Sequence, residues 1–112
     1  MKYKQKFQQL LNQCDSVGVS VILLFANELR DYAALHTAIG RQLGFTLDGN
    51  EMPDNTVYLD GNFSRGGKYK VRYQNLKHEI MEMELMKQGM NYWEAHCLSL
   101  IEEKKEEEQC VL

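Results

Sequence analysis

The first part of the chain carries apolar residues at helical spacing. Phe7, Leu10, Leu11 and Cys14 stand at i, i+3, i+4 and i+7, with polar residues between them. Such spacing places one apolar stripe along an amphipathic helix. The pattern therefore predicts a helix over residues 3–14.

A strand and a second helix are predicted next. Residues 19–25 form a short run that is apolar on both faces and β-branched at its start, which favours a central strand covered by helices. Asn27 can begin a helix, apolar positions then recur at helical spacing up to Leu43, and Gly44 is a suitable stop. We therefore predict a helix over residues 27–43.

The middle of the chain is rich in turn-forming residues. Residues 46–55 contain the only proline and are expected to form a loop, and residues 56–60 are predicted to form a second short strand. Glycine-containing residues 61–67 follow as a flexible turn region. In residues 68–73 three cations alternate with two tyrosines and a valine, which predicts a half-buried strand. The alternative is that residues 68–73 begin the helix that follows.

The C-terminal part predicts two helices joined at a glycine. The first begins near residue 74 and ends at Gly89, and the second begins with Asn91 as its cap. Glu94 stands three residues after Asn91, as the partner in a capping box. The second helix gives way to a charged run, so residues 103–112 are expected to form a frayed tail.

These elements predict an α+β fold. We expect a small sheet of about three strands, with N-terminal helices and a C-terminal antiparallel helix pair packed on it. A chain of 112 residues is the size of one ordinary domain, and we place that domain over residues 1–102.

Composition narrows the setting of this domain. The net charge of −3 gives no general attraction to nucleic acid or to an anionic membrane, and the longest apolar run is too short to cross a bilayer. Three cysteines without close spacing fit reduced thiols better than a disulfide framework. We therefore expect a cytoplasmic protein whose partner is a protein or peptide.

The C-terminal helices carry the most specific chemistry. His78 and Glu82 are four residues apart and share a helix face, while Glu82 and His96 each stand seven residues from Gly89. If the helices fold back at Gly89, two imidazoles and one carboxylate converge, and a divalent metal such as zinc takes such ligands. In that interpretation Glu79 is the general base that accepts a proton from a metal-activated water.

A simpler interpretation stays open for each of these residues. The first helix can be a surface helix with one apolar face, and His96 can be a half-buried histidine held by hydrogen bonds. Cys97 is rotated by about 100° from His96 on a helix, which favours a core position over a ligand. His36, on the predicted helix 27–43, is expected to be an ordinary core or surface histidine.

The segment His78-Glu79-Ile80-Met81-Glu82, on a helix that follows an edge-like strand at residues 56–60, resembles the His-Glu-x-x-His helix of zincin metallopeptidases. Compact zincin-like domains of phages and mobile elements are the nearest comparison, and the wider segment up to His96 is also similar to phage virion-associated and polymorphic-toxin domains. The resemblance covers about residues 56–100 and implies a metallopeptidase fold. Glu82 stands where a zincin has its second helical histidine.

Three functions follow from these observations. The first is a zincin-like, zinc-dependent hydrolase with His78, Glu82 and His96 as ligands and Glu79 as base. The second is a non-catalytic interaction module, of phage or mobile-element type, whose helices present a Met/aromatic surface. That surface would consist of Met86, Met90, Tyr92 and Trp93. The third is a nucleic-acid-directed toxin or inhibitor that uses the basic residues 65–72, which the acidic net charge disfavours.

Overall fold

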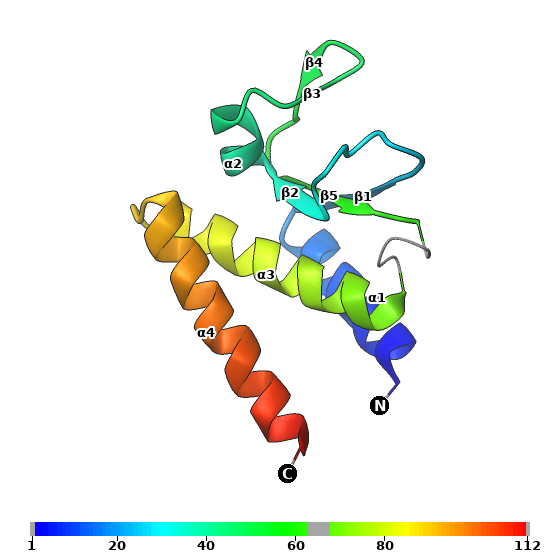
Figure 1. Ribbon diagram of the computed structural model, residues 1–112, viewed down its shortest axis with the longest axis vertical. Coiled ribbons are helices and arrows are strands. Elements are labelled where there is room, and N and C mark those ends of the chain that lie inside the picture. Colours follow the sequence, from blue (N-terminus) through cyan, green and yellow to red (C-terminus); the bar gives the residue numbers. More distant parts are fainter. Residues whose placement is uncertain (1, 63–67, 112) are drawn as a thin grey trace.

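The computed structural model describes residues 2–62 and 68–111 and has a mixed α+β fold (Figure 1). Residues 63–67, most of the predicted turn region, lie outside the described residues. The elements in chain order are α1 (Tyr3–Ser16), β1 (Ser20–Leu24), β2 (Ala34–His36), α2 (Thr37–Gln42), β3 (Thr46–Leu47), β4 (Asn50–Glu51), β5 (Thr56–Asp60), α3 (Tyr69–Lys87) and α4 (Tyr92–Val111). The predicted fold class is confirmed. None of the described helices is long and apolar enough to cross a membrane.

The three-stranded sheet has the order β1-β5-β2. β5 pairs in parallel with β1 and antiparallel with β2, so it is the central strand. All five residues of β5 are buried, because the strand has neighbours on both edges and covered faces on both sides. The prediction of residues 19–25 as a central strand is therefore wrong, as is the edge-like position assigned to residues 56–60.

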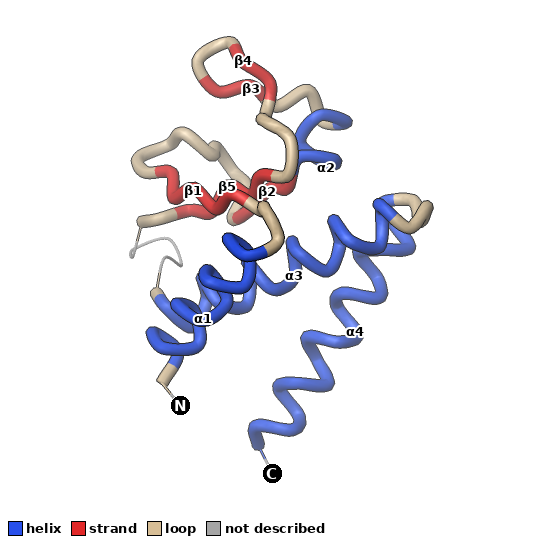
Figure 2. The backbone as a smooth tube through the Cα atoms, turned by 180° about the vertical axis from the view of Figure 1, so that it is seen from behind, coloured by secondary structure: helices blue, strands red, loops and turns tan. Residues whose placement is uncertain are grey.

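Alternate residues of β5 face two separate apolar cores. Val57 and Leu59 pack with Phe7 of α1 and with residues of α3, whereas Tyr58 packs on the opposite face with a second cluster. That second cluster consists of Leu24, Leu29, Leu35, Ile39, Phe45 and Met52 as well as Tyr58. The two-residue period of a strand therefore divides the interior into one core under α1 and α3 and another under α2 and the β3–β4 hairpin. Figure 2 shows that hairpin at the end of the molecule farthest from both termini.

The helix predicted over residues 27–43 is wrong for most of its length. Ala26 and Arg30 have φ angles of 53° and 59°, which lie in the left-handed region and interrupt a right-handed helix. Residues of β2 then pair with β5, and only Thr37–Gln42 is helical. The apolar residues do recur at helical spacing, but those at positions 34–36 belong to a strand that pairs with β5.

The predicted loop over residues 46–55 contains a small hairpin. Strands β3 and β4 pair antiparallel, and Asp48 and Gly49 between them both have positive φ. Two consecutive residues of that conformation, with the sequence Asp-Gly, form the tight turn that favours a two-residue hairpin. The loop prediction is therefore wrong at residues 46–47 and 50–51.

Residues 69–73 are the first turn of α3, so the alternative interpretation is confirmed and the predicted strand is wrong. Tyr69, Tyr73 and Ile80 pack against the core that α1 also contacts, which is a helical and not an alternating pattern. Arg72 is buried, and its Nη2 donates to the carbonyl of Gly61 at 2.8 Å. The basic strand face required by a nucleic-acid function is absent from the described residues.

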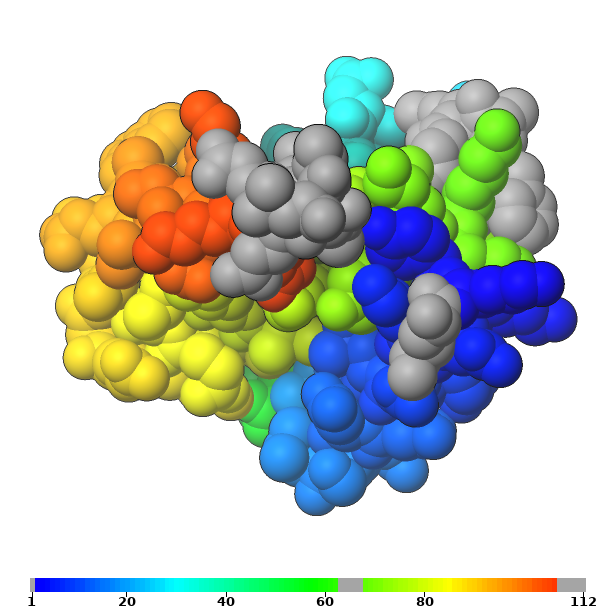
Figure 3. Space-filling model, turned by 90° about the horizontal axis from the view of Figure 1, so that it is seen from below, coloured from blue at the N-terminus to red at the C-terminus, as the bar shows by residue number. Residues whose placement is uncertain are grey.

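The C-terminal helices form the predicted antiparallel pair. Gly89 has a φ of 102° and separates the two helices. Asn91 caps α4, since its Oδ1 accepts from the backbone N–H of Glu94 at 2.9 Å and its Nδ2 donates to the Glu94 carboxylate at 2.7 Å. An ion pair joins Lys77, near the middle of α3, to Glu106 in the C-terminal part of α4. Figure 3 shows α4 and the C-terminal part of α3 on one half of a face, and α1 on the other half.

α4 continues through the segment that was expected to be a frayed tail. Residues 103–111 are helical, and Glu103 contacts His78 of α3. Two residues of α3 pair with this charged segment, since His78 contacts Glu103 and Lys77 contacts Glu106. The helical segment therefore places Glu103 beside His78, which is one of the predicted ligands.

Candidate metal centre

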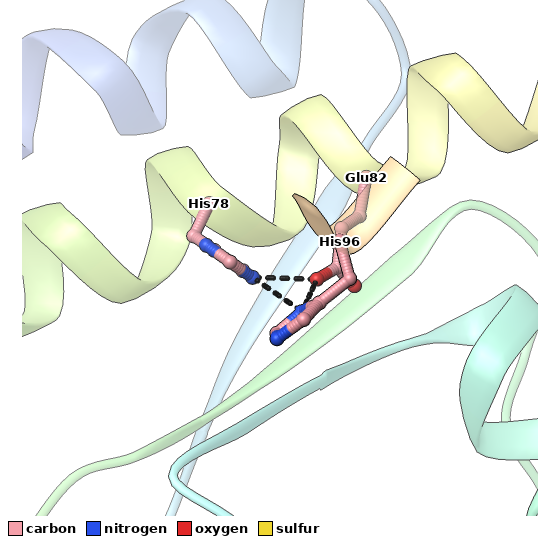
Figure 4. Close-up of side chains that lie close together, drawn as sticks. All are labelled: His78, Glu82 and His96. Carbon is pink, nitrogen blue, oxygen red and sulfur yellow. Dashed lines mark hydrogen bonds and ion pairs between the residues drawn. The ribbon is translucent and has the colours of Figure 1, made fainter. Parts of the chain in front are cut away.

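The fold brings together residues of α3, α4 and β2. His78 and Glu82 lie one turn apart on α3, and His96 faces them from α4 (Figure 4). His36 ends β2 and is the register partner of Val57, whose side chain faces the core under α3. Paired residues of antiparallel strands point to the same side of the sheet, so His36 is directed towards α3 as well.

The outer group, which consists of His78, Glu82 and His96, converges on one carboxylate oxygen. Glu82 Oε2 is 2.5 Å from His78 Nε2 and 2.5 Å from His96 Nδ1, and the two nitrogen atoms are 3.2 Å apart. The side chains of His78 and His96 are 13% and 30% exposed, so solvent reaches this group. Two imidazole nitrogens and a carboxylate oxygen are a zinc-type donor set.

The spacing of these atoms can be compared with that around a bound ion. Four-coordinate zinc with ligands at roughly 2.0–2.1 Å has its ligand atoms about 3.3 Å apart. The nitrogen atoms of His78 and His96, 3.2 Å apart, match this spacing. Glu82 Oε2 lies closer, so it has to withdraw by less than about 1 Å to admit an ion. The residues of the outer group fit a divalent metal.

Two neighbours orient the outer histidines. Glu103 Oε2 lies 3.4 Å from His78 Nδ1 and favours a proton on that nitrogen, so Nε2 is the atom that would give up its proton to bind a metal. The Tyr92 ring stacks on His96 with centroids 5.3 Å apart, and its hydroxyl lies 3.4 Å from His96 Nδ1. Tyr92 is therefore a hydroxyl donor beside the ligand atoms.

The inner group consists of His36, Glu79 and Glu82. Glu82 Oε1 accepts a hydrogen bond from His36 Nε2 at 3.1 Å, and Glu79 Oε2 lies 3.8 Å from the same nitrogen. His36 is completely buried, and Glu82 and Glu79 are 1% and 8% exposed. Among the described residues, Glu79 Oε2 and His36 Nδ1 have no hydrogen-bond partner. In both the outer and the inner group, three His or Glu ligand atoms lie close enough together to hold a metal ion.

Burial and histidine contacts act differently on the two carboxylates. Burial by itself raises the pKa of Glu82, but hydrogen bonds from His36, His78 and His96 outweigh it and lower the pKa to about 2. The pKa of Glu79 is raised to about 8, first by burial and then by repulsion from Glu82. The hydrogen bond to Glu82 raises the pKa of His78. One carboxylate is thus held ionised and its neighbour is held protonated at neutral pH.

The structure unites the three predicted ligands but places other residues differently. Glu79 is directed inwards, towards His36. Cys97 is exposed, which corrects the expectation of a core position, whereas Cys14 is buried. His36 and Tyr92 were not predicted as site residues. Tyr92 carried a signal, because it precedes His96 by one helical turn, whereas His36 is 46 residues from Glu82 and carried none.

Comparison with protein-family models, with curated proteins and with solved structures gives no match for this chain. The candidate site is therefore judged from its own geometry.

Proposed function

We propose that the protein is a metal-dependent hydrolase of zincin-like type. One observation carries the proposal: Glu82 Oε2 lies 2.5 Å from a nitrogen of both His78 and His96, and the three side chains come from two helices that meet at a partly exposed position. The resemblance of residues 78–82 to the zincin helix supports a peptide as substrate. The free Cys14 and Cys97 support a cytoplasmic setting.

His78, Glu82 and His96 would hold a zinc ion, which would supply a nucleophile by lowering the pKa of water to about 7. Glu103 favours Nε2 of His78 as the atom that binds the metal, and His36 holds the second oxygen of Glu82 away from the outer histidines. Glu79 is the proton acceptor in this proposal. Its pKa is about 8 without metal, and a bound cation would lower that pKa and so favour the ionised form that accepts a proton. The Tyr92 hydroxyl is placed to donate to developing negative charge on a substrate carbonyl.

Metal analysis followed by an activity assay tests this proposal. Full-length protein stripped with a chelator is titrated with Zn²⁺, and hydrolysis of a quenched-fluorescence peptide mixture is followed before and after metal addition. We expect stoichiometric zinc and zinc-dependent hydrolysis, both lost in His78→Ala and His96→Ala. Glu84→Gln is the matched control, because Glu84 is an exposed carboxylate on the same helix. Wild-type protein that binds no zinc would refute the proposal.

A second candidate function is a protein-interaction module. Trp93 is 72% exposed at the start of α4, and Leu100 and Ile101 further along the helix are about half exposed. Tyr92, by contrast, stacks on His96, so it belongs to the candidate metal centre and leaves the predicted Met/aromatic surface smaller. Self-association measured by sedimentation, and its loss in Trp93→Ala, would favour this function over hydrolysis.

A further inference from the structure

The inner group has the spacing of a metal site in its own right. Its ligand atoms all lie within 4.8 Å of one another. His36 Nε2 is 3.1 Å from Glu82 Oε1 and 3.8 Å from Glu79 Oε2. Ligand atoms around a four-coordinate ion lie about 3.3 Å apart when each is roughly 2.0–2.1 Å from the ion. The two separations from His36 Nε2, 3.1 and 3.8 Å, lie on either side of 3.3 Å. The separations from Glu82 to the outer histidines, 2.5 Å each, are both shorter than 3.3 Å.

Glu82 serves the two groups through different oxygen atoms. Oε2 contacts His78 and His96, whereas Oε1 contacts His36. A carboxylate that bridges two ions likewise gives one oxygen to each, and two-metal hydrolytic sites hold their ions roughly 3.5–4 Å apart. The arrangement of Glu82 is therefore that of a bridging ligand.

Two neighbouring carboxyl groups are buried in the inner group. Glu79 and Glu82 are 8% and 1% exposed, and within the described residues their ion pairs are formed with imidazoles and not with lysine or arginine. A buried polar atom without a hydrogen bond is costly, and Glu79 Oε2 lacks a hydrogen-bond partner among those residues. A divalent ion at this oxygen would supply the missing partner.

We propose that His36, Glu79 and Glu82 hold a second divalent ion, so that the protein carries a two-ion centre bridged by Glu82. This inference rests on the proposed function, since the outer group holds the first ion. In the two-ion form Glu79 is a ligand, and its role as proton acceptor is confined to the one-ion form. Because His36 and Glu82 are buried, the inner ion exchanges with solvent more slowly than the outer ion.

Counting ions per folded chain tests the inference. Full-length protein is stripped with a chelator, equilibrated with excess Mn²⁺, which suits carboxylate-containing sites, and analysed by native mass spectrometry. We expect two ions in the wild type and in the control Glu84→Gln, and one in Glu79→Gln, which keeps the shape of the side chain. His96→Ala should also retain one ion. The wild type should give the electron paramagnetic resonance spectrum of a spin-coupled manganese pair, and Glu79→Gln that of an isolated ion.

The possible results separate this inference from the proposed function. One ion in the wild type and the same number in Glu79→Gln would overturn the second site and leave the outer site standing. Absence of any bound ion would overturn both. If Glu79→Gln does not fold, the wild-type ion count and the coupled spectrum decide by themselves, and His36→Gln provides a second variant of the inner group.

Discussion

The outer and inner groups share one carboxylate but differ in their place in the fold. The outer histidines lie on two helices at a partly exposed position, whereas His36 lies at the end of a strand and is completely buried. An exposed imidazole loses few contacts when its partner is removed, but a buried one loses packing and its hydrogen bond together. We therefore expect Glu82 to couple metal binding to folding, whereas each of the other four residues should affect mainly one of the two.

The largest effect is expected for Glu82→Gln, which acts on both groups. The amide cannot serve three histidines as the carboxylate does, and removing one partner from a buried charged cluster costs about 3–5 kcal/mol. We expect lost zinc binding and a lower free energy of unfolding in the chelated protein, measured by isothermal titration and by urea denaturation. Equal stability of Glu82→Gln and the Glu84→Gln control would contradict the coupling.

Loss of a histidine from the inner group should mainly lower stability, whereas loss of one from the outer group should mainly abolish metal binding. In chelated protein His36→Ala should lower the free energy of unfolding by about 3 kcal/mol, because a fully buried and hydrogen-bonded side chain is removed. His96→Ala should cost less stability, because His96 is 30% exposed and His36 and His78 still contact Glu82, but it should abolish binding of the outer ion. Urea denaturation and zinc titration of the same samples measure both. Similar stability losses in the two variants would erase the distinction between the groups.

Glu79 of the inner group should make the free energy of unfolding depend on pH in the metal-free protein. The pKa of Glu79 is about 8 in the folded protein, above its ordinary value of 4.5, so the folded state holds a proton that the unfolded state releases. This contribution is complete below pH 4.5 and is lost as the pH rises towards 8, at about 1.4 kcal/mol per pH unit. Glu79→Gln should remove that slope.

The range from pH 4.5 to 6.5 isolates this effect. Glu82, with its lowered pKa, changes stability below pH 4.5 and with the opposite sign, whereas His78, with its raised pKa, acts only above its ordinary value of 6.5. Urea denaturation of chelated wild type and Glu79→Gln at several pH values measures the difference. Parallel curves would show that Glu79 is ionised in the folded state.

The smallest predicted effect concerns the start of α4. Asn91→Ala removes the cap five residues before His96 and should cost about 1 kcal/mol, whereas Asn91→Asp should retain most of the stability. Because the cap fixes α4 and not β2, zinc binding by the outer group should weaken while the pH dependence due to Glu79 stays unchanged. Zinc titration and urea denaturation of both variants check this. If Asn91→Ala also changed the slope of stability against pH that is due to Glu79, the cap would affect the inner group as well as the outer group.

The outer group was predictable because its geometry is local. The spacing of His78 and Glu82 follows from helix periodicity, and the turn at Gly89 places His96 opposite Glu82. The cap of α4 was equally readable from Asn91 and Glu94. The sequence did not predict that the Glu79 side chain is directed towards His36, because this direction depends on how the sheet packs against α3.

Residues 27–43 show where sequence patterns fail. Their apolar positions fit a helix, but left-handed backbone at Ala26 and Arg30 and the pairing of β2 with β5 decided otherwise. A short strand gains its hydrogen bonds from a partner distant in sequence, so its own pattern is a weak signal. The same limitation applies to residues 68–73, where contact with α1 favoured a helix.

The sequence by itself determined an α+β chain with a C-terminal helix pair and three candidate ligands on it, since helical spacing and a turn are encoded within 19 residues from His78 to His96. Only the tertiary structure decided that His36 completes the cluster. Its approach to Glu82 requires the register of β2 on β5 and the packing of α3 across that sheet, and no pattern within a single segment specifies either.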